Sequence, residues 1–229
     1  MALTPKKKGG SYKVMPYNEF MQGYADQDFE YKYLLKGKMT FGNKKLPKDT
    51  AIFNMGSGID CPSKKLGLCE VINAGVRCYA ISAEQMYPSV LPYRRRQEVY
   101  WKAVTPDQFV ADFLARISRK KIPIKRLRVN ESGDLWDQES YNKMVKIANI
   151  LFEQHGIRTY MYTARKDLNL KNHGHLNVQG SGFKVVNNYK AVPNIPFPLK
   201  ADERECKCDC KVCTLCVVAK DKTIYVPFH

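Results

Sequence analysis

The sequence predicts an α/β protein, either a partial (β/α) barrel or an open and mostly parallel sheet, with an irregular N-terminal arm and a cysteine-rich C-terminal segment. Two observations favour this class. Over residues 50–192, short β-branched and aromatic runs alternate with segments whose apolar residues recur at helical spacing, which is typical of βαβ units with parallel strands. The chain has 229 residues, of which 44% are hydrophobic, so one domain with a substantial core is expected.

The N-terminal part is expected to pass from an arm into a strand and then a helical region. Residues 1–49 mix Gly, Lys and Tyr without a clear period, and we expect an irregular basic arm there. The apolar run 50–55, which Gly56 ends, predicts a buried strand that leads into a loop. Residues 79–104 show helical spacing but contain two prolines, so an interrupted helix is expected.

The central part holds two helices with clear start signals. Thr105 is suited to cap a helix whose first turn contains Pro106, and the apolar residues that follow form one face. Polar and apolar residues alternate over 126–130, which predicts a strand. Asp137 is expected to begin the next helix, and Gly156 stands where a left-handed C-terminal cap would end it.

The C-terminal part is expected to add strands and a tail to the same domain. Residues 157–163 and 183–186 predict strands, separated by a polar segment rich in Gly and Asn. Residues 193–198 are proline-rich and extended, and 223–226 predict a last strand. We therefore expect a βα core at 50–192 and a tail at 193–229 that closes a metal site.

The tail contains five cysteines within eleven residues, in a C-x-C-x-C-x2-C-x2-C pattern. Metal ligation explains this density better than disulfides do, because the N-terminus carries no apolar signal segment and the cytoplasm keeps thiols reduced. The last three have the C-x2-C-x2-C spacing of ferredoxin-type loops, which favours an iron–sulfur cluster, with zinc as the alternative. The predicted ligands of this group are Cys206, Cys208, Cys210, Cys213 and Cys216.

A second group of cysteines follows the first predicted strand. Cys61, Cys69 and Cys78 are separated by seven and eight residues, and three thiolates make an incomplete ligand set. A tail cysteine or an external group would have to supply the fourth ligand of a 4Fe-4S cluster. The alternative is that Cys69 or Cys78 binds no metal and is a small buried apolar residue.

Polar loops follow the predicted strands and are expected to meet at the carboxyl edge of the sheet. Glu131 and Asp134 are candidate acid, base or hydrogen-bonding groups there, and Arg165 is a candidate anion ligand. Equally, Asp134 could cap a helix and Arg165 could form a surface ion pair. For His173 and His175 we expect an ordinary loop, because no partner ligand stands at a metal-binding spacing.

The formal net charge of +16 makes a nucleic acid, or the nucleic-acid machinery of a host, the expected partner. Between Arg94 and Arg128 the sequence holds eleven Lys or Arg residues and three acids. A basic surface without a dedicated ligand is the alternative. No apolar run approaches the length of a membrane span, so we expect a cytoplasmic protein. The candidate phosphate-contacting residues are Arg94, Arg95, Arg96, Arg119, Lys120 and Lys121.

The chain resembles the phage gene-product-88-like family and, more distantly, a second phage family with a Cys-Tyr-Ala motif. This resemblance implies a phage origin, hence the cytoplasm of a host cell, and a βα architecture similar to that of radical S-adenosylmethionine enzymes. Those enzymes use a C-x3-C-x2-C motif, whereas this chain has C-x7-C-x8-C. The resemblance is carried by Cys61-Pro62, Cys78-Tyr79-Ala80, Tyr87-Pro88-Ser89, Gly133-Asp134, Tyr162-Thr163-Ala164-Arg165 and the C-terminal Cys-x2-Cys.

Three functions remain open from the sequence. The first is a nucleic-acid-associated or regulatory iron–sulfur protein, whose cluster stabilises the fold or senses redox state. The second is a radical or redox modification enzyme with a cluster at the carboxyl edge of the sheet. The third is a zinc-stabilised adaptor that binds a host protein.

Overall fold

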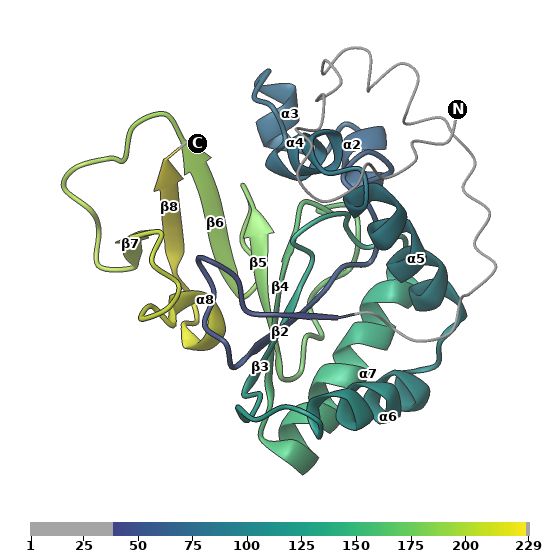
Figure 1. Ribbon diagram of the computed structural model, residues 1–229. Coiled ribbons are helices and arrows are strands. Elements are labelled where there is room, and N and C mark those ends of the chain that lie inside the picture. The colour runs from purple at the N-terminus through teal and green to yellow at the C-terminus, as the bar shows by residue number, and fades with distance from the viewer. Residues whose placement is uncertain (1–38, 228–229) are drawn as a thin grey trace.

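A computed structural model describes residues 39–227 of the chain (Figure 1). Most of the predicted basic arm, residues 1–38, lies outside the described residues. In chain order the elements are β1 (Thr40–Phe41), β2 (Thr50–Phe53), α2 (Pro62–Lys65), α3 (Glu70–Asn73), α4 (Tyr79–Met86), α5 (Val90–Ala103), α6 (Pro106–Ile117), β3 (Arg126–Val129), α7 (Gln138–His155), β4 (Arg158–Thr163), β5 (Leu176–Ser181), β6 (Asn187–Val192), β7 (Glu203–Glu205), α8 (Leu215–Val218) and β8 (Thr223–Pro227).

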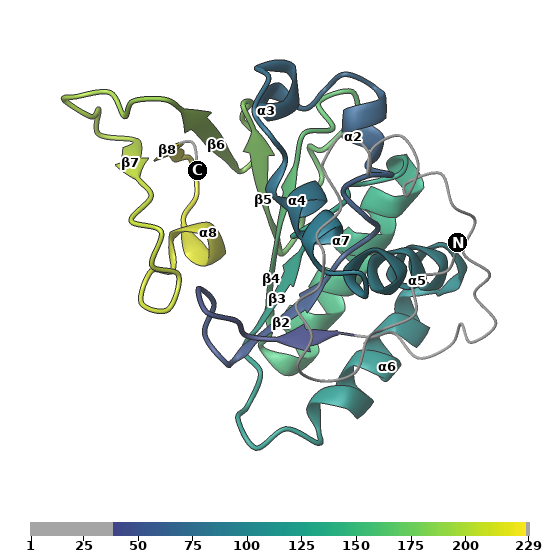
Figure 2. The same ribbon diagram turned by 45° about the horizontal axis from the view of Figure 1, so that its top comes forward.

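One sheet contains the eight described strands in the order β1-β2-β3-β4-β5-β6-β8-β7. Every neighbouring pair is parallel except β1 and β2. Strands β2 to β6 lie side by side in chain order. Connections between parallel strands are almost always right-handed, so connections that all advance in the same direction across a sheet lie on the same face of it. Accordingly, α5, α6 and α7 lie on one face, while α8 and the tail lie over the other (Figure 2). The prediction of an open, mostly parallel sheet is confirmed.

The core lies between the sheet and the helices on its covered face. Phe53 of β2 contacts Phe109 of α6 edge to face, with ring centroids 5.0 Å apart. Trp101 of α5 is fully buried and packs on the same Phe109 ring at 5.9 Å. Large aromatic side chains such as these contribute much of the burial free energy of a domain. This packing fixes β2 and β3, the strands that precede the predicted site loops.

The predicted helix boundaries are confirmed where a side chain determines them. The Thr105 hydroxyl accepts a hydrogen bond from the Gln108 N–H at 3.2 Å, at the start of α6. The Asp137 carboxylate accepts one from the Ser140 N–H at 2.7 Å, at the start of α7. Gly156 ends α7 in the left-handed conformation. Among residues 39–227, no helix combines the length and apolar character needed to cross a bilayer.

The prediction of a strand at 183–186 is wrong. Those residues form the loop between β5 and β6, and the strands are instead Leu176–Ser181 and Asn187–Val192. Asn, Gln and Gly have low strand propensity, but β5 is buried between two neighbours and its amides find partners in the tail. Tertiary pairing therefore overrides the local preference.

Candidate metal centre

The face of the sheet opposite α6 and α7 is polar. Its side chains come from alternate positions of β3 to β6, because successive residues of a strand point to opposite faces. Arg128 stands beside Tyr160, which stands beside Asn177, and one step further along Tyr162 is paired with Gln179. This polar sheet face consists of Arg126, Arg128, Tyr160, Tyr162, Asn177, Gln179, Asn187 and Tyr189.

Buried amide side chains of this face hold the cysteine-rich tail. The Asn177 amide donates to the carbonyls of Cys216 and Ala219 at 3.2 and 3.1 Å. The Gln179 amide donates to the same Cys216 carbonyl at 3.0 Å, and Asn187 donates to Ala219 at 2.8 Å. A helix of four residues such as α8 is not stable alone. The sheet amides therefore fix α8, and with it the position of Cys216.

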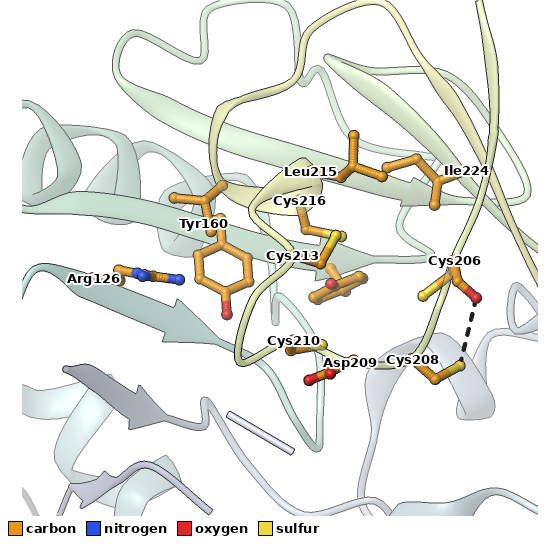
Figure 3. A pocket seen from close by; sticks show the side chains of 12 residues that line it. Arg126, Tyr160, Cys206, Cys208, Asp209, Cys210, Cys213, Leu215, Cys216 and Ile224 are labelled. Carbon is orange, nitrogen blue, oxygen red and sulfur yellow. Dashed lines mark hydrogen bonds between the residues drawn. The ribbon is translucent and has the colours of Figure 1, made fainter. Parts of the chain in front are cut away.

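All five tail cysteines line one small cavity on the polar sheet face, together with Arg126, Tyr160 and Tyr162 (Figure 3). The cavity measures about 30 Å³. That volume has room for roughly one or two water-sized groups. Within residues 39–227 none of the eight cysteines forms a disulfide, and all eight are partly buried. The tail thus gathers soft sulfur donors around a space of the size that a single ion needs.

Burial raises the pKa of three thiols of this cavity, those of Cys206, Cys210 and Cys216. Burial raises the pKa of Cys216 to about 11, although a hydrogen bond from Tyr162 and the charge of Arg128 oppose the shift. Burial likewise raises the pKa of Cys206, and the neighbouring Cys208 adds to the effect. A metal ion that binds here would therefore have to displace protons from the thiols.

Arg128 is a largely buried cation on the polar sheet face, with a long ion pair as its charge partner. Its side chain is 18% exposed, and its Nε is buried without a hydrogen-bond partner. The nearest carboxylate, that of Glu131, lies 3.6 Å away, and the Tyr162 ring centroid is 5.1 Å away. The charge of Arg128 lowers the pKa of Cys210 and Cys216, although burial raises both. A largely buried guanidinium is stabilised by negative charge close to it, because burial of an unpaired charge is costly.

The second cysteine group lies at the carboxyl edge of the sheet and does not line the tail cavity. Cys61, Cys69 and Cys78 occupy the N-cap positions of α2, α3 and α4. Burial, and then the charge of Asp134, raise the pKa of Cys61 to about 12. The pKa of Cys69 is raised by burial and by the neighbouring Cys78. The structure thus separates the eight cysteines into an edge group and a tail group.

In residues 39–227, no three Cys, His, Asp or Glu side chains stand in a metal-ligating arrangement. The tail thiols converge on one cavity, but they are not drawn together around a common point (Figure 3).

The three loops that follow β2, β3 and β4 meet, as expected from parallel strands. Asp134 joins them: its carboxylate accepts hydrogen bonds from the Ser63 hydroxyl at 2.6 Å and from the Ala164 N–H at 2.8 Å. It also accepts the Leu135 N–H at 2.8 Å. Burial raises the pKa of Asp134, and these hydrogen bonds oppose the shift. With its oxygens occupied in this way, Asp134 acts as a clasp between loops.

The other two candidates for catalysis have different surroundings. Arg165 is buried and pairs with Asp167 through two hydrogen bonds of 2.8 Å, and it also donates to the Trp136 carbonyl. It therefore braces the loop after β3. Glu131 is partly buried and accepts a hydrogen bond from Asn43 at 3.1 Å. Of the three candidates, only Glu131 has an ion pair in the described chain with a residue of the polar sheet face, namely Arg128.

The six candidate nucleic-acid residues fall into two sets. Arg94 is only 7% exposed and pairs with buried Glu84 at 2.7 Å, so its guanidinium is committed inside the protein. Arg95 pairs with Asp60 at 2.7 Å, and Arg96 is partly buried. By contrast, Arg119, Lys120 and Lys121 are all exposed after α6. Arg94 therefore has a structural role inside the protein, and the positive charge of the Arg94 to Arg96 run did not reveal that role.

Sequence reasoning missed the residues of the polar sheet face. Arg126 and Arg128 alternate with Leu127 and Val129 in β3, a central strand, and that alternation was a usable signal. A charged residue on the inner positions of a central strand requires a partner or a ligand. The amides of β5 gave no such signal, because their role depends on where the tail folds back.

The fold and the thiol-lined cavity define a class: an α/β protein whose cysteine-rich tail lies on the polar face of a parallel sheet. The chain belongs to the phage gene product 88 family, because the family model described as Gene product 88 matches residues 30–217. No curated protein and no solved structure matches the chain.

Proposed function

We propose that this phage protein is a metal–thiolate protein of the host cytoplasm, in which the tail cysteines hold an iron–sulfur cluster against the polar sheet face. The observation that carries the proposal is the convergence of five thiols on one cavity, close to the Arg128 guanidinium, whose Nε is buried without a hydrogen-bond partner. A metal held by four thiolates carries net negative charge. That charge would neutralise Arg128, and Arg128 would in turn favour ionised thiols.

The donor set fits an iron–sulfur cluster. Thiolates are the usual ligands of such clusters, and Cys210, Cys213 and Cys216 have the spacing of loops that wrap around one. The cluster would supply one-electron redox chemistry or a structural crosslink. The sheet amides Asn177 and Gln179 would orient the chain around Cys216, and Tyr162 would donate a hydrogen bond to its sulfur.

Zinc is the second candidate, and the size of the cavity favours it. A space of about 30 Å³ suits one ion better than a four-iron cluster. Four of the five tail thiolates would complete a closed tetrahedral site, and the protein would then be a binding module stabilised by its metal.

The test is the metal content of protein purified without oxygen. About four irons and four sulfides per chain with a broad brown absorption band would support the cluster, and about one zinc in a colourless sample would support the alternative. We expect the double change Cys213→Ser with Cys216→Ser, which leaves only three tail thiols, to weaken metal binding at least about tenfold, since even loss of a ligand's partner costs that much. Val212→Ser, at an adjacent position that is 79% exposed, is the matched control and should keep its metal. Metal-free wild-type protein, or equal metal in both variants, contradicts the proposal.

We further propose that nucleic acid contacts the exposed cations after α6. The support is that Arg119, Lys120 and Lys121 are exposed and consecutive, and that no ion pair in the described chain uses them. Lys120 also lies over the Phe41 ring, with its Nζ 3.8 Å from the ring centroid, and three clustered cations of this kind can contact phosphates.

Changing all three of these residues to Gln is expected to weaken binding of a DNA or RNA duplex and to flatten its salt dependence. The slope of log K against log salt should fall by about 0.9 for each lost phosphate contact on DNA. The same change at the exposed residues Lys166, Lys171 and Lys200 removes equal charge elsewhere and serves as the control. Equal loss in both variants would mean that net charge alone drives binding.

A further inference from the structure

A second cavity lies on the other flank of α8. It measures about 70 Å³ and is bounded by the end of α7, the starts of β4 and β5, the loop at 173–175 and the tail after Cys216. Val217 lines this cavity as well as the thiol cavity. The two cavities therefore share a wall, but none of the cysteines lines the second one.

The lining of the second cavity is cationic. Arg158, Lys220, His173 and His175 contribute to it, and no acidic residue does. In residues 39–227, neither the Arg158 guanidinium nor the Lys220 ammonium has an ion pair or a hydrogen bond with another side chain. Two unpaired cations in one concave site repel each other, and a bound anion would remove that cost.

The nearby acids are already engaged. Glu153 lies 3.4 Å from the ring of His175, and Asp221, which follows Lys220, lies 3.3 Å from Lys184. Both acids lie outside the lining, but Glu153 contacts His175, so the positive charge of the cavity comes from Arg158 and Lys220.

The walls of the cavity are held in position by specific contacts. The His175 ring stacks on Phe152 with centroids 4.3 Å apart, and the Arg158 guanidinium lies 5.3 Å from the same Phe152 ring. The Asn149 side chain accepts a hydrogen bond from the His175 N–H at 2.8 Å. Gly174 has a φ of +53°, and a Cβ there would approach Asn149 to 2.3 Å. The loop is thus fitted to α7 and presents both histidines to the cavity.

We propose that this second cavity binds a phosphate group. A phosphate is a compact dianion whose oxygens accept hydrogen bonds from the fork of an arginine and from an ammonium or imidazole N–H. The cavity volume of about 70 Å³ is sufficient for one such group. The phosphate can belong to free inorganic phosphate or to a nucleotide.

The experiment titrates the full chain with inorganic phosphate and, in a second arm, with adenosine monophosphate, by calorimetry. Arg158→Gln with Lys220→Gln is the test variant. Lys166→Gln with Lys200→Gln removes the same charge at exposed sites outside the cavity and is the control. We expect the test variant to weaken phosphate binding at least about tenfold, because two charge-assisted contacts are lost, while the control stays close to wild type. Tighter binding of the nucleotide than of phosphate would identify a nucleotide as the source.

Hydrogen exchange gives a second readout that does not depend on metal content. Bound phosphate should slow amide exchange at 215–219, because Val217, Val218 and Lys220 line the cavity. Absence of phosphate binding at about 10 mM, a concentration that would reveal even a millimolar dissociation constant, overturns the proposal. Equal binding by the test variant and wild type overturns it too. Melting curves of both variants check that the substitutions leave the fold intact.

Discussion

Replacing Glu84 by alanine is expected to lower the free energy of unfolding by about 3–5 kcal/mol, the cost of removing one partner of a buried ion pair. Glu84 is 1% exposed and accepts hydrogen bonds from the N–H groups of Gly58 and Ile59 at 2.7 and 3.0 Å. It also pairs with Arg94 at 2.7 Å. The substitution leaves a buried guanidinium without its carboxylate, with the Ala80 carbonyl as its remaining acceptor, and leaves two backbone donors without an acceptor. Chemical denaturation followed by circular dichroism measures the loss.

The matched control is Glu139→Ala, which removes an exposed carboxylate from the first turn of α7. Its effect should stay within about 0.5–1 kcal/mol. If both variants unfold at the same denaturant concentration as wild type, Glu84 does not fix the loop before Cys61. The expected loss would also explain why Arg94 is a poor candidate for phosphate contact: its charge balances Glu84.

The parts of the fold that the sequence predicted best are those set by local chemistry. The start of α6 depends on the Thr105 hydroxyl and on Pro106, and the start of α7 depends on the Asp137 carboxylate. Each signal acts within a few residues of itself, so no knowledge of the tertiary structure is needed to interpret it. The convergence of the strand-end loops was also predictable, because parallel strands bring their carboxyl ends to one edge.

The parts that the sequence did not predict depend on contacts between distant segments. Asn177 and Gln179 belong to a strand only because β5 is paired on both sides and the Cys216 carbonyl accepts their amide hydrogens. The spacing of the cysteines indicates two groups, but the separation of these groups in space could not be deduced from the spacing. It follows from the tail lying over the sheet face rather than over its carboxyl edge (Figure 2).

The separation of the two groups changes what the cysteines can do. The tail group contains five thiols, enough for a complete set of four ligands, whereas the edge group contains three. A centre in the tail therefore needs no ligand from Cys61, Cys69 or Cys78. Arg128 lies close to the tail group, since its charge lowers the pKa of Cys210 and of Cys216, although burial raises both.

Replacing Asp134 by alanine is expected to lower the free energy of unfolding by about 2–5 kcal/mol, because the buried N–H groups of Leu135 and Ala164 lose their acceptor. The Ser63 hydroxyl, two residues after Cys61, is released at the same time. Asp137→Ala is the matched control in the same loop, where loss of the cap should cost about 1 kcal/mol. Urea unfolding compares the two, and hydrogen exchange at 61–65 and 163–165 reports whether the loops separate. Faster exchange in both segments for Asp134→Ala alone would identify this carboxylate as the clasp that holds the edge cysteines in place, whereas equal stability of the two variants would leave each loop positioned by its own strand.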